Sequence, residues 1–267
     1  MTTPIRLVVS DVDGTLVTPD KTLTDAAVAA VARLHDASIH FAVTSGRPPR
    51  GMAMLVEPLA LTDPMAGFNG GLIVAPDLSA LEEHCVDAAL VPAIVGVLEA
   101  SGVDVWCYQG NDWIVRDPDG PHVAQEAATV QFPPTVRPGT GPVEDVVKIV
   151  GVSDDADTIA TALRSTQDAF GGRVAASTSQ PYYLDVTHLD ANKGAVIAYL
   201  STALGVRRDE IATIGDGAND MLMFAQSGLS IAMGNSAPAV QQSAHRVTAS
   251  NDDEGFAAAI EQFILAS

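Results

Sequence analysis

Apolar runs and amphipathic stretches alternate along the first third of the chain. Leu7–Val9 is a short apolar run, typical of a strand buried in a parallel sheet. From Val28 to Leu34, apolar residues return at every third position, as they do on one face of a helix. His40–Thr44 and Met65–Phe68 predict two further strands. This order of strand, helix and strand predicts parallel pairing with right-handed crossovers.

The middle of the chain changes character between about Leu81 and Val186. It predicts helices over Ala88–Ala100 and Asp155–Phe170, with a Pro- and Gly-rich loop over Phe132–Pro142. Its predicted strands are Val103–Tyr108, Trp113–Val115, Val146–Val152, Arg173–Ala176 and Tyr182–Val186. Such a mixture predicts a small α+β block within an otherwise α/β chain.

The alternation of helices and strands then resumes. Gly194–Leu204 and Met221–Gln226 predict helices that end at Gly205 and Gly228, respectively. The other predicted elements are strands at Glu210–Thr213 and Ser230–Met233 and a terminal helix at Phe256–Ile264. The fold class is therefore α/β, with the middle block inserted between two parts of one parallel sheet.

Two carboxylates, Asp11 and Asp13, follow the first predicted strand directly, and Gly14 then frees the backbone to turn away. Like charges this close repel, and one pKa rises unless a cation or a proton intervenes. The pair suits a nucleophilic aspartate, a second aspartate for proton transfer and a divalent cation between them. The alternative is a solvated turn after a strand.

Three further polar clusters lie at strand ends or helix starts. They are Thr44–Arg47, Asn192–Gly194 and Gly215–Asp220. In an open α/β sheet such ends converge on one crevice. A carboxylate nucleophile, a metal, a cation and hydroxyl donors together match the needs of phosphoryl transfer.

The four clusters, in this order, resemble the four motifs of the haloacid-dehalogenase superfamily of phosphatases. Phe68–Gly71 and Gly215–Asp220 are similar to the Cof-like branch in particular. The resemblance covers essentially the whole chain. It implies a Rossmann-like core over residues 1–81 and 188–267, an inserted α+β cap over residues 82–187 that sets specificity, and a site between them.

The resemblance also implies roles for the acidic residues. Asp11 is expected to attack phosphorus, and Asp13 to protonate the leaving alcohol and then activate water. The dehalogenases of this superfamily lack that second acid. Mg²⁺ is the expected cofactor, bound by Asp11, by the backbone carbonyl of Asp13 and by Asp216. Asn219 and Asp220 stay open between metal binding and orientation of the site.

The remaining candidates bind the phosphoryl group or the substrate. Ser45 aligns with the motif hydroxyl because Gly46 and Arg47 follow it, and Thr44 is the alternative. Lys193 is expected to neutralise charge on the phosphoryl group and on the nucleophile. A structural role and a substrate contact are equally open for Arg47 and Asn69.

Charge and composition limit the classes of molecule that this chain is expected to bind. The 267 residues carry a net charge of −19, which argues against nucleic acid or an anionic membrane as a partner. A metal and a few local cations must therefore set the field around an anionic substrate. Met1–Ile5 runs directly into the first strand without a secretory pattern, so we expect a cytoplasmic monomer or small homo-oligomer. Cys85 and Cys107 lack the spacing of a metal site.

The leading hypothesis is a Mg²⁺-dependent phosphatase of small phosphorylated metabolites, such as sugar phosphates, that forms an aspartyl-phosphate. One alternative is a phosphoryl transferase or mutase, which differs only in the acceptor. Another is a non-catalytic protein that binds a phosphorylated ligand, and the intact acidic set argues against it. The aromatic residues of the middle block are expected to pack in its core rather than to stack on a sugar: Trp106, Tyr108, Trp113, Tyr182 and Tyr183.

Overall fold

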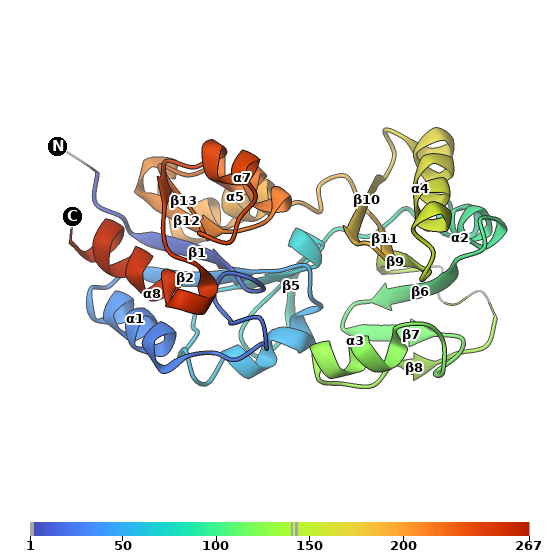
Figure 1. Cartoon of the computed structure of the whole chain (residues 1–267), viewed down its shortest axis with the longest axis horizontal. Helices are drawn as coiled ribbons and strands as arrows, with labels where there is room; N and C mark the ends of the chain where they lie inside the picture. The colour runs from blue at the N-terminus through green and yellow to red at the C-terminus, as the bar shows by residue number, and fades with distance from the viewer. Residues whose placement is uncertain (1–2, 140, 142–143, 267) are drawn as a thin grey trace.

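The apolar run at the start of the chain becomes the middle of a large sheet. The computed structural model describes residues 3–139, 141 and 144–266. Its strands form one eight-stranded sheet and one six-stranded sheet, which lie side by side along the length of the molecule (Figure 1). No helix in these described ranges is long and apolar enough to cross a membrane.

The larger sheet is parallel over most of its width. In spatial order its strands are β14 (Arg246–Val247), β13 (Leu229–Ala232), β12 (Ile211–Gly215), β1 (Leu7–Asp11), β2 (His40–Thr44), β3 (Met65–Gly67), β4 (Leu72–Val74) and β5 (Ala80–Glu83). The strands from β14 to β3 pair in parallel, and β4 and β5 extend the sheet as antiparallel strands. The carboxyl ends of β1, β2 and β12 therefore lie along one edge.

Helices cover both faces of this sheet because its central strands are apolar on both faces. Val8 and Phe41 pack with one group of helices, α1 (Asp25–Asp36) and α8 (Gly255–Ala259), the latter continued by a π-helical turn at Ile260–Leu265. The helices on the opposite face are α5 (Lys193–Leu204), α6 (Met221–Phe224) and α7 (Pro238–Ser243). The result is a three-layer α/β/α arrangement (Figure 1).

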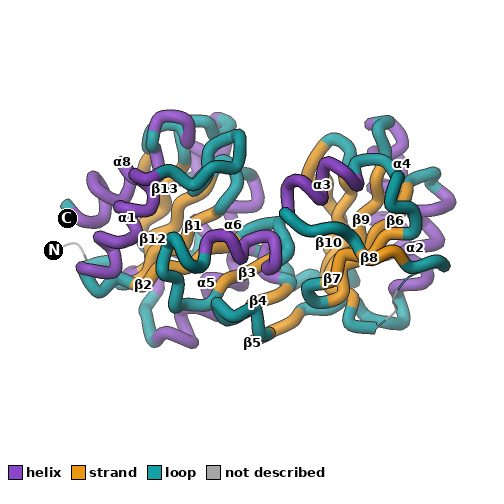
Figure 2. The backbone as a smooth tube through the Cα atoms, turned by 90° about the horizontal axis from the view of Figure 1, so that it is seen from below, coloured by secondary structure: helices purple, strands orange, loops and turns teal. Residues whose placement is uncertain are grey.

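The smaller sheet belongs to the middle of the chain. Its strands, in spatial order, are β10 (Ala175–Gln180), β11 (Tyr183–Thr187), β9 (Val146–Val152), β6 (Asp104–Gln109), β7 (Asp112–Val115) and β8 (Thr135–Val136). Helices α2 (Val91–Ala100) and α4 (Ala156–Phe170) pack with Ile149 and Leu184 on one face. Helix α3 (Val123–Val130) lies on the other face, which is turned toward the larger sheet (Figures 1 and 2).

Four of the five aromatic residues singled out in the middle block are buried, as the sequence predicted. Trp106 makes edge-to-face ring contacts with Trp113 and Tyr183, and Tyr108 packs against Phe68 of the larger sheet's unit. Tyr182 is half-buried and stacks on His122. These rings join the two parts of the molecule into one apolar cluster.

Two chain segments connect the sheets. One follows β5 and the other follows β11, and the rings of His84 and His188 within them stack with centroids 5.7 Å apart. The predicted boundary after residue 81 falls inside β5, which pairs with β4 in the larger sheet. The predicted boundary after residue 187 coincides with the end of β11. The division into core and cap stays a prediction.

Several predicted elements have different bounds in the structure. Helix α2 begins at Val91, because Pro92 occupies its first turn. Glu210 belongs to a 3₁₀ turn rather than to β12, and the predicted strand Arg173–Ala176 is displaced to β10. The predicted loop Phe132–Pro142 contains the short strand β8, and residues 140 and 142 of that loop lie outside the described ranges.

Candidate active site

The polar clusters predicted from the sequence meet at the carboxyl edge of the larger sheet. Asp11 is the last residue of β1, and Asp216 follows directly after the neighbouring strand β12. Lys193 is the first residue of α5, where the Asn192 side chain caps the helix by accepting a hydrogen bond from the backbone N–H of Ala195. Parallel pairing therefore brings together groups that are some 200 residues apart in sequence.

Lys193 links two of the acids. It is 1% exposed, and its Nζ donates to Asp11 Oδ1 and to Asp220 Oδ1, each at 2.5 Å. Burial alone would lower the pKa of the Lys193 ammonium, but the charges of Asp11 and Asp220 raise it above its ordinary value. Lys193 therefore stays protonated and acts as a fixed positive charge beside Asp11.

Asp220 is held from both sides. Its second oxygen, Oδ2, accepts hydrogen bonds from the backbone N–H groups of Asp216 and Gly217, at 2.9 and 2.8 Å. This carboxylate therefore fixes the loop after β12 while its other oxygen holds Lys193. Both of its oxygens therefore have hydrogen-bond partners within the protein.

A cation fits the acidic cluster. Oxygens of Asp11, Asp216 and Asp220 lie within 4.8 Å of one another. Burial raises the pKa of Asp11 well above its ordinary value, and the charges of Asp220 and Asp216 raise it further against the opposing charge of Lys193. Burial, followed by the charge of Asp220, also raises the pKa of Asp216. Three carboxylates with one lysine leave an excess of negative charge that a divalent cation would balance.

Asp216 has two further partners, Thr15 and Asn235. The Thr15 hydroxyl donates to Asp216 Oδ1 at 3.2 Å. The Asn235 amide donates to the backbone carbonyl of Gly14 at 2.9 Å and to Asp216 Oδ2 at 3.4 Å. Asn235 follows β13 in a turn, and its place beside Gly14 depends on pairing between distant strands.

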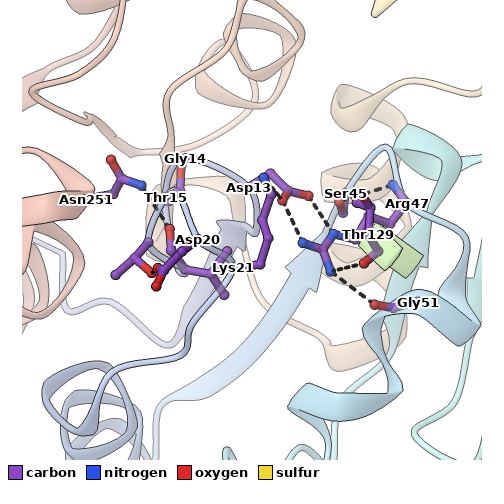
Figure 3. A network of polar contacts seen from close by, with 12 residues as sticks. Asp13, Gly14, Thr15, Asp20, Lys21, Ser45, Arg47, Gly51, Thr129 and Asn251 are labelled. Carbon is purple, nitrogen blue, oxygen red and sulfur yellow. Dashed lines mark hydrogen bonds and ion pairs between the residues drawn. The ribbon is translucent and has the colours of Figure 1, made fainter. Parts of the chain in front are cut away.

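Asp13 is paired with two cations, Arg47 and Lys21 (Figure 3). The Arg47 guanidinium forms a two-pronged ion pair with it, Nε to Oδ2 and Nη2 to Oδ1, both 2.7 Å. Lys21 Nζ also lies 2.7 Å from Asp13 Oδ1. Burial would raise the pKa of Asp13, but the hydrogen bonds and charges of Arg47 and then Lys21 outweigh it, so the pKa lies below its ordinary value.

Arg47 also reaches the smaller sheet's unit. Its Nη1 donates to the carbonyl of Gly51 at 3.3 Å and to that of Thr129, in α3, at 3.5 Å (Figure 3). The guanidinium is buried in these contacts. Of the two roles left open for Arg47, the structure thus favours positioning of Asp13 over a direct substrate contact.

The hydroxyl candidates differ in their partners. Ser45 Oγ accepts a hydrogen bond from the backbone N–H of Arg47 at 3.2 Å (Figure 3). Thr44 Oγ1 is buried and has no hydrogen-bond partner among the described residues. Asn69, in a left-handed backbone conformation with φ of 58°, accepts a hydrogen bond at 3.0 Å from Asn219. The choice between Thr44 and Ser45 stays open.

A cavity of about 600 Å³ opens beside these residues. Asn69, Lys193 and Asn219 line it on the side of the larger sheet, and Lys148 and Asp185 line it on the side of the smaller sheet. Its volume lies in the range of about 300–1,000 Å³ that is common for small-molecule sites. Lys148 and Asp185 were not singled out from the sequence, although each places a charge inside an otherwise apolar predicted strand.

Comparisons with known proteins agree with this geometry. The model of the haloacid dehalogenase-like hydrolase family matches residues 8–260. The 5-amino-6-(5-phospho-D-ribitylamino)uracil phosphatase YitU of Bacillus subtilis is 27% identical over 98% of this chain and 99% of its own. An HMP-PP phosphatase of an Enterobacter species is 27% identical over 87% of this chain and 85% of its own.

A solved haloacid dehalogenase-like hydrolase from Bacteroides thetaiotaomicron is similar in structure, with a TM-score of 0.87 and 26% identity. The match covers 97% of this chain and 99% of that protein. Its fold and the family match both extend through the larger and the smaller sheet. The chain therefore belongs to the haloacid dehalogenase-like hydrolase family, in its Cof-like branch, and is a phosphatase.

Proposed function

We propose that this phosphatase is a Mg²⁺-dependent phosphomonoesterase that hydrolyses small phosphorylated metabolites, in particular sugar phosphates, through an aspartyl-phosphate at Asp11. The observation that carries the proposal is the contact of Asp11, which clusters with Asp216, with buried Lys193, which lines the cavity. A fixed cation beside a carboxylate nucleophile is what phosphoryl transfer requires.

In the first step a carboxylate oxygen of Asp11 attacks phosphorus, and the bond from phosphorus to the ester oxygen breaks. The leaving alkoxide takes a proton from Asp13. Lys193 balances the negative charge that Asp11 and the phosphoryl oxygens share during the transfer. The products of this step are the free alcohol, phosphorylated Asp11 and ionised Asp13.

In the second step a water molecule attacks phosphorus of the aspartyl-phosphate while Asp13 accepts its proton. The bond from phosphorus to Asp11 breaks, which releases inorganic phosphate and restores both carboxyl groups. Asp13 must leave the ion pairs with Arg47 and Lys21 to hold a proton at the start, because those contacts favour its ionised form. We propose that substrate binding displaces one of them.

The residues that would hold Mg²⁺ are Asp11, Asp216 and the backbone carbonyl of Asp13. When bound, the ion supplies positive charge to a phosphoryl oxygen and orients it toward the nucleophile. Asp220 is proposed as the residue that positions Lys193 and the loop of Asp216, since its two oxygens are taken by those groups. The cluster of acidic side chains supports this assignment.

The remaining roles concern the substrate. Ser45 is proposed to donate to a phosphoryl oxygen, with Thr44 as the alternative hydroxyl. Asn69 and Asn219, joined by a hydrogen bond at the cavity wall, are proposed to contact the substrate beside the phosphoryl group. The cap proposed over residues 82–187 would select the leaving group, because part of the cavity wall comes from it.

The relatives support a small, soluble ligand. YitU is named for a substrate whose phosphate sits on a ribityl chain, a polyhydroxylated group. The acidic chain, with a net charge of −19, is unsuited to nucleic acid or an anionic membrane. A cytoplasmic location and a monomer or small homo-oligomer stay predictions.

The test is hydrolysis of p-nitrophenyl phosphate by the purified protein. We expect phosphate release with Mg²⁺, none with excess EDTA, and recovery when Mg²⁺ is restored. Added glycerol distinguishes the transferase alternative, since a transferase would form glycerol phosphate in preference to inorganic phosphate. Turnover that persists in excess chelator would contradict the metal role, and absence of all turnover would contradict the function.

A further inference from the structure

We infer that Lys148 and Asp185, a buried ion pair in the smaller sheet, bind a hydroxyl of the leaving group and select phosphate esters of polyhydroxylated molecules. The inference rests on the proposed function, because a leaving group exists only if Asp11 reacts with a phosphate ester. It assigns the polyol specificity to two particular side chains.

The two charged side chains are buried, which costs free energy of desolvation. Lys148 lies in β9 and Asp185 in the adjacent strand β11, where their neighbours are apolar. Their exposed fractions are 8% and 7%, and Lys148 Nζ lies 2.6 Å from Asp185 Oδ2. A buried ion pair contributes little to stability compared with well-packed apolar residues. The fold would lose little without the pair, so its presence indicates a use in binding.

The pair leaves hydrogen-bonding capacity unused. Asp185 Oδ1 is buried and has no hydrogen-bond partner within the described part of the chain. The ammonium of Lys148 has three N–H donors, and its contact with Asp185 needs one. An unmatched carboxylate oxygen in a buried site is costly. A ligand that brought a donor to Oδ1 and an acceptor to Nζ would remove that cost.

A hydroxyl group is such a ligand, because it donates one hydrogen bond and accepts others. A second phosphate on the leaving group could only accept, and its charge would face Asp185. An apolar or aryl leaving group could do neither. The Lys148–Asp185 pair carries no net charge, which further favours a neutral hydroxyl over a charged group.

The cavity connects this pair with the reacting groups. Lys193, which contacts Asp11, lies on one side, and Lys148 and Asp185 lie on the other. Three hydroxyl residues of β10 also line it, namely Ser177, Thr178 and Ser179. Phe68 is the aromatic residue among the described lining, and its ring packs against Tyr108 with centroids 5.0 Å apart. The wall therefore suits a hydroxylated leaving group better than one that stacks.

Neighbouring residues hold the lysine in place. The Lys148 ammonium lies 6.0 Å from the centre of the Tyr108 ring, within range of a cation–π contact. The Tyr108 hydroxyl in turn donates to Glu126 Oε1 at 3.1 Å. These contacts limit the motion of Lys148 at the cavity wall.

The experiment compares two esters of similar length, sorbitol 6-phosphate and hexyl phosphate, with p-nitrophenyl phosphate as a third substrate. We expect the parent enzyme to prefer sorbitol 6-phosphate. Asp185→Asn should lower kcat/KM for sorbitol 6-phosphate by about 10- to 100-fold, mainly through KM, as expected for lost hydrogen bonds to a charged group. The other two substrates should change by less than about threefold.

Asp104→Asn is the matched control. Asp104 is exposed at the start of β6, in the same sheet as Asp185. Its substitution replaces a carboxylate by an amide, as Asp185→Asn does. Asp104 lies four residues before Tyr108, at the end of the sheet away from Lys148. We expect it to leave the ratio of kcat/KM between the two alkyl esters unchanged.

A double variant covers the case in which Asp185→Asn does not fold. Lys148→Met with Asp185→Leu removes both charges and leaves neither unpaired. It should fold and show the same loss specific to sorbitol 6-phosphate. An equal loss on all three substrates, or a parent enzyme without preference for sorbitol 6-phosphate, would overturn the inference alone. A parent enzyme inactive on every ester would overturn the proposed function as well.

Discussion

Lys193 is the residue on which the charge balance of the site depends. It contacts Asp11 and Asp220 at the same distance and is almost fully buried. Burial raises the pKa of Asp11, and the positive charge of Lys193 opposes that effect beside this proposed nucleophile. This pairing gives a direct expectation for the nucleophile itself.

Asp11→Asn should lower kcat for p-nitrophenyl phosphate by at least about a thousandfold, because an amide is a poor nucleophile. The change is nearly isosteric, and Lys193 keeps its contact with Asp220. Circular dichroism and thermal unfolding should therefore show an intact fold. A variant that retained parental turnover would rule out an aspartyl-phosphate at this residue.

Glu126 gives a pH-dependent prediction away from the reacting groups. Burial raises the pKa of this carboxyl above its ordinary value, although Lys148 and the Tyr108 hydroxyl oppose the shift. The folded state therefore holds the proton to higher pH than the unfolded state does. The stability that Glu126 contributes is complete below its unfolded pKa and is lost as pH rises through its folded pKa.

Glu126→Gln cannot lose that proton, and its amide oxygen can still accept from the Tyr108 hydroxyl. The variant should gain stability relative to the parent as pH rises from 4 to 8, measured by urea unfolding at each pH. Glu57→Gln, at an exposed position, serves as the matched control for the loss of one negative charge. A stability difference between Glu126→Gln and the parent that is independent of pH would contradict the assigned cause.

Residue placement was predictable where strand ends determine it. Asp11 and Asp216 follow neighbouring parallel strands, so their meeting with Lys193 follows from topology alone. The partners of Asp13 were not predictable, because Arg47 reaches it only through the side-chain geometry of another loop. The charged pair in the smaller sheet was missed for a similar reason: the register of its two strands is set by tertiary contacts.

At the scale of elements, the turn after β1 depends on a glycine. Gly14 has φ of +78°, and a Cβ there would lie 2.4 Å from Asp216 Oδ2. Gly102, after α2, has a similar φ of +83°, but no atom of the described residues lies within 4 Å of its Cβ position. A comparison of substitutions at the two glycines therefore distinguishes the effect of backbone strain from the effect of contact with Asp216.

Gly14→Ala and Gly102→Ala should each lose about 1–2 kcal/mol of stability through the left-handed backbone. Only Gly14→Ala should also lower kcat/KM, by about a hundredfold, because it displaces Asp216 and a shift of about 1 Å has that effect. Unfolding curves and phosphatase assays on both variants test this. Equal activity of the two would show that the turn does not position Asp216.

Long apolar elements were predicted well, and short or exposed ones were not. The strands β2 and β9 have the predicted bounds, because most of their residues are apolar, although Lys148 interrupts the run in β9. Helix α3 has only eight residues. It begins after His122, whose backbone is left-handed and whose side chain does not cap the helix, so the sequence contains no capping residue that would predict it. Strand β5 is largely exposed and shows no alternation of polar and apolar residues.

At the scale of the whole molecule, the two sheets share one apolar cluster, and polar contacts cross their junction, among them that of Arg47. Phe68 meets Tyr108 there, and Arg47 links Asp13 with Thr129. The buried aromatics of the smaller sheet's unit, Trp106, Tyr108, Trp113 and Tyr183, pack at this junction and do not line the cavity, so their replacement should affect stability before specificity. The acid–base candidate is thereby connected to the unit that would select the leaving group.

Metal binding should stabilise the whole chain by mass action. At a Mg²⁺ concentration 100 times its Kd, the folded state would gain about 2.7 kcal/mol. A chain of net charge −19 also responds to any salt, because ions screen its self-repulsion. The comparison must therefore be made between variants at one Mg²⁺ concentration, with NaCl of equal ionic strength as the reference.

Asp216→Asn should reverse the order of stability between the two conditions. In EDTA the variant should be more stable than the parent, since it removes one of three clustered carboxylates and keeps an acceptor for Thr15. In Mg²⁺ the parent should rise above the variant, because the amide is a weak ligand for a hard cation. Thermal unfolding of both proteins in both buffers measures the crossing. If Mg²⁺ raised the unfolding temperature of both by the same amount, the ion would be screening surface charge, and the acidic cluster would not be its site.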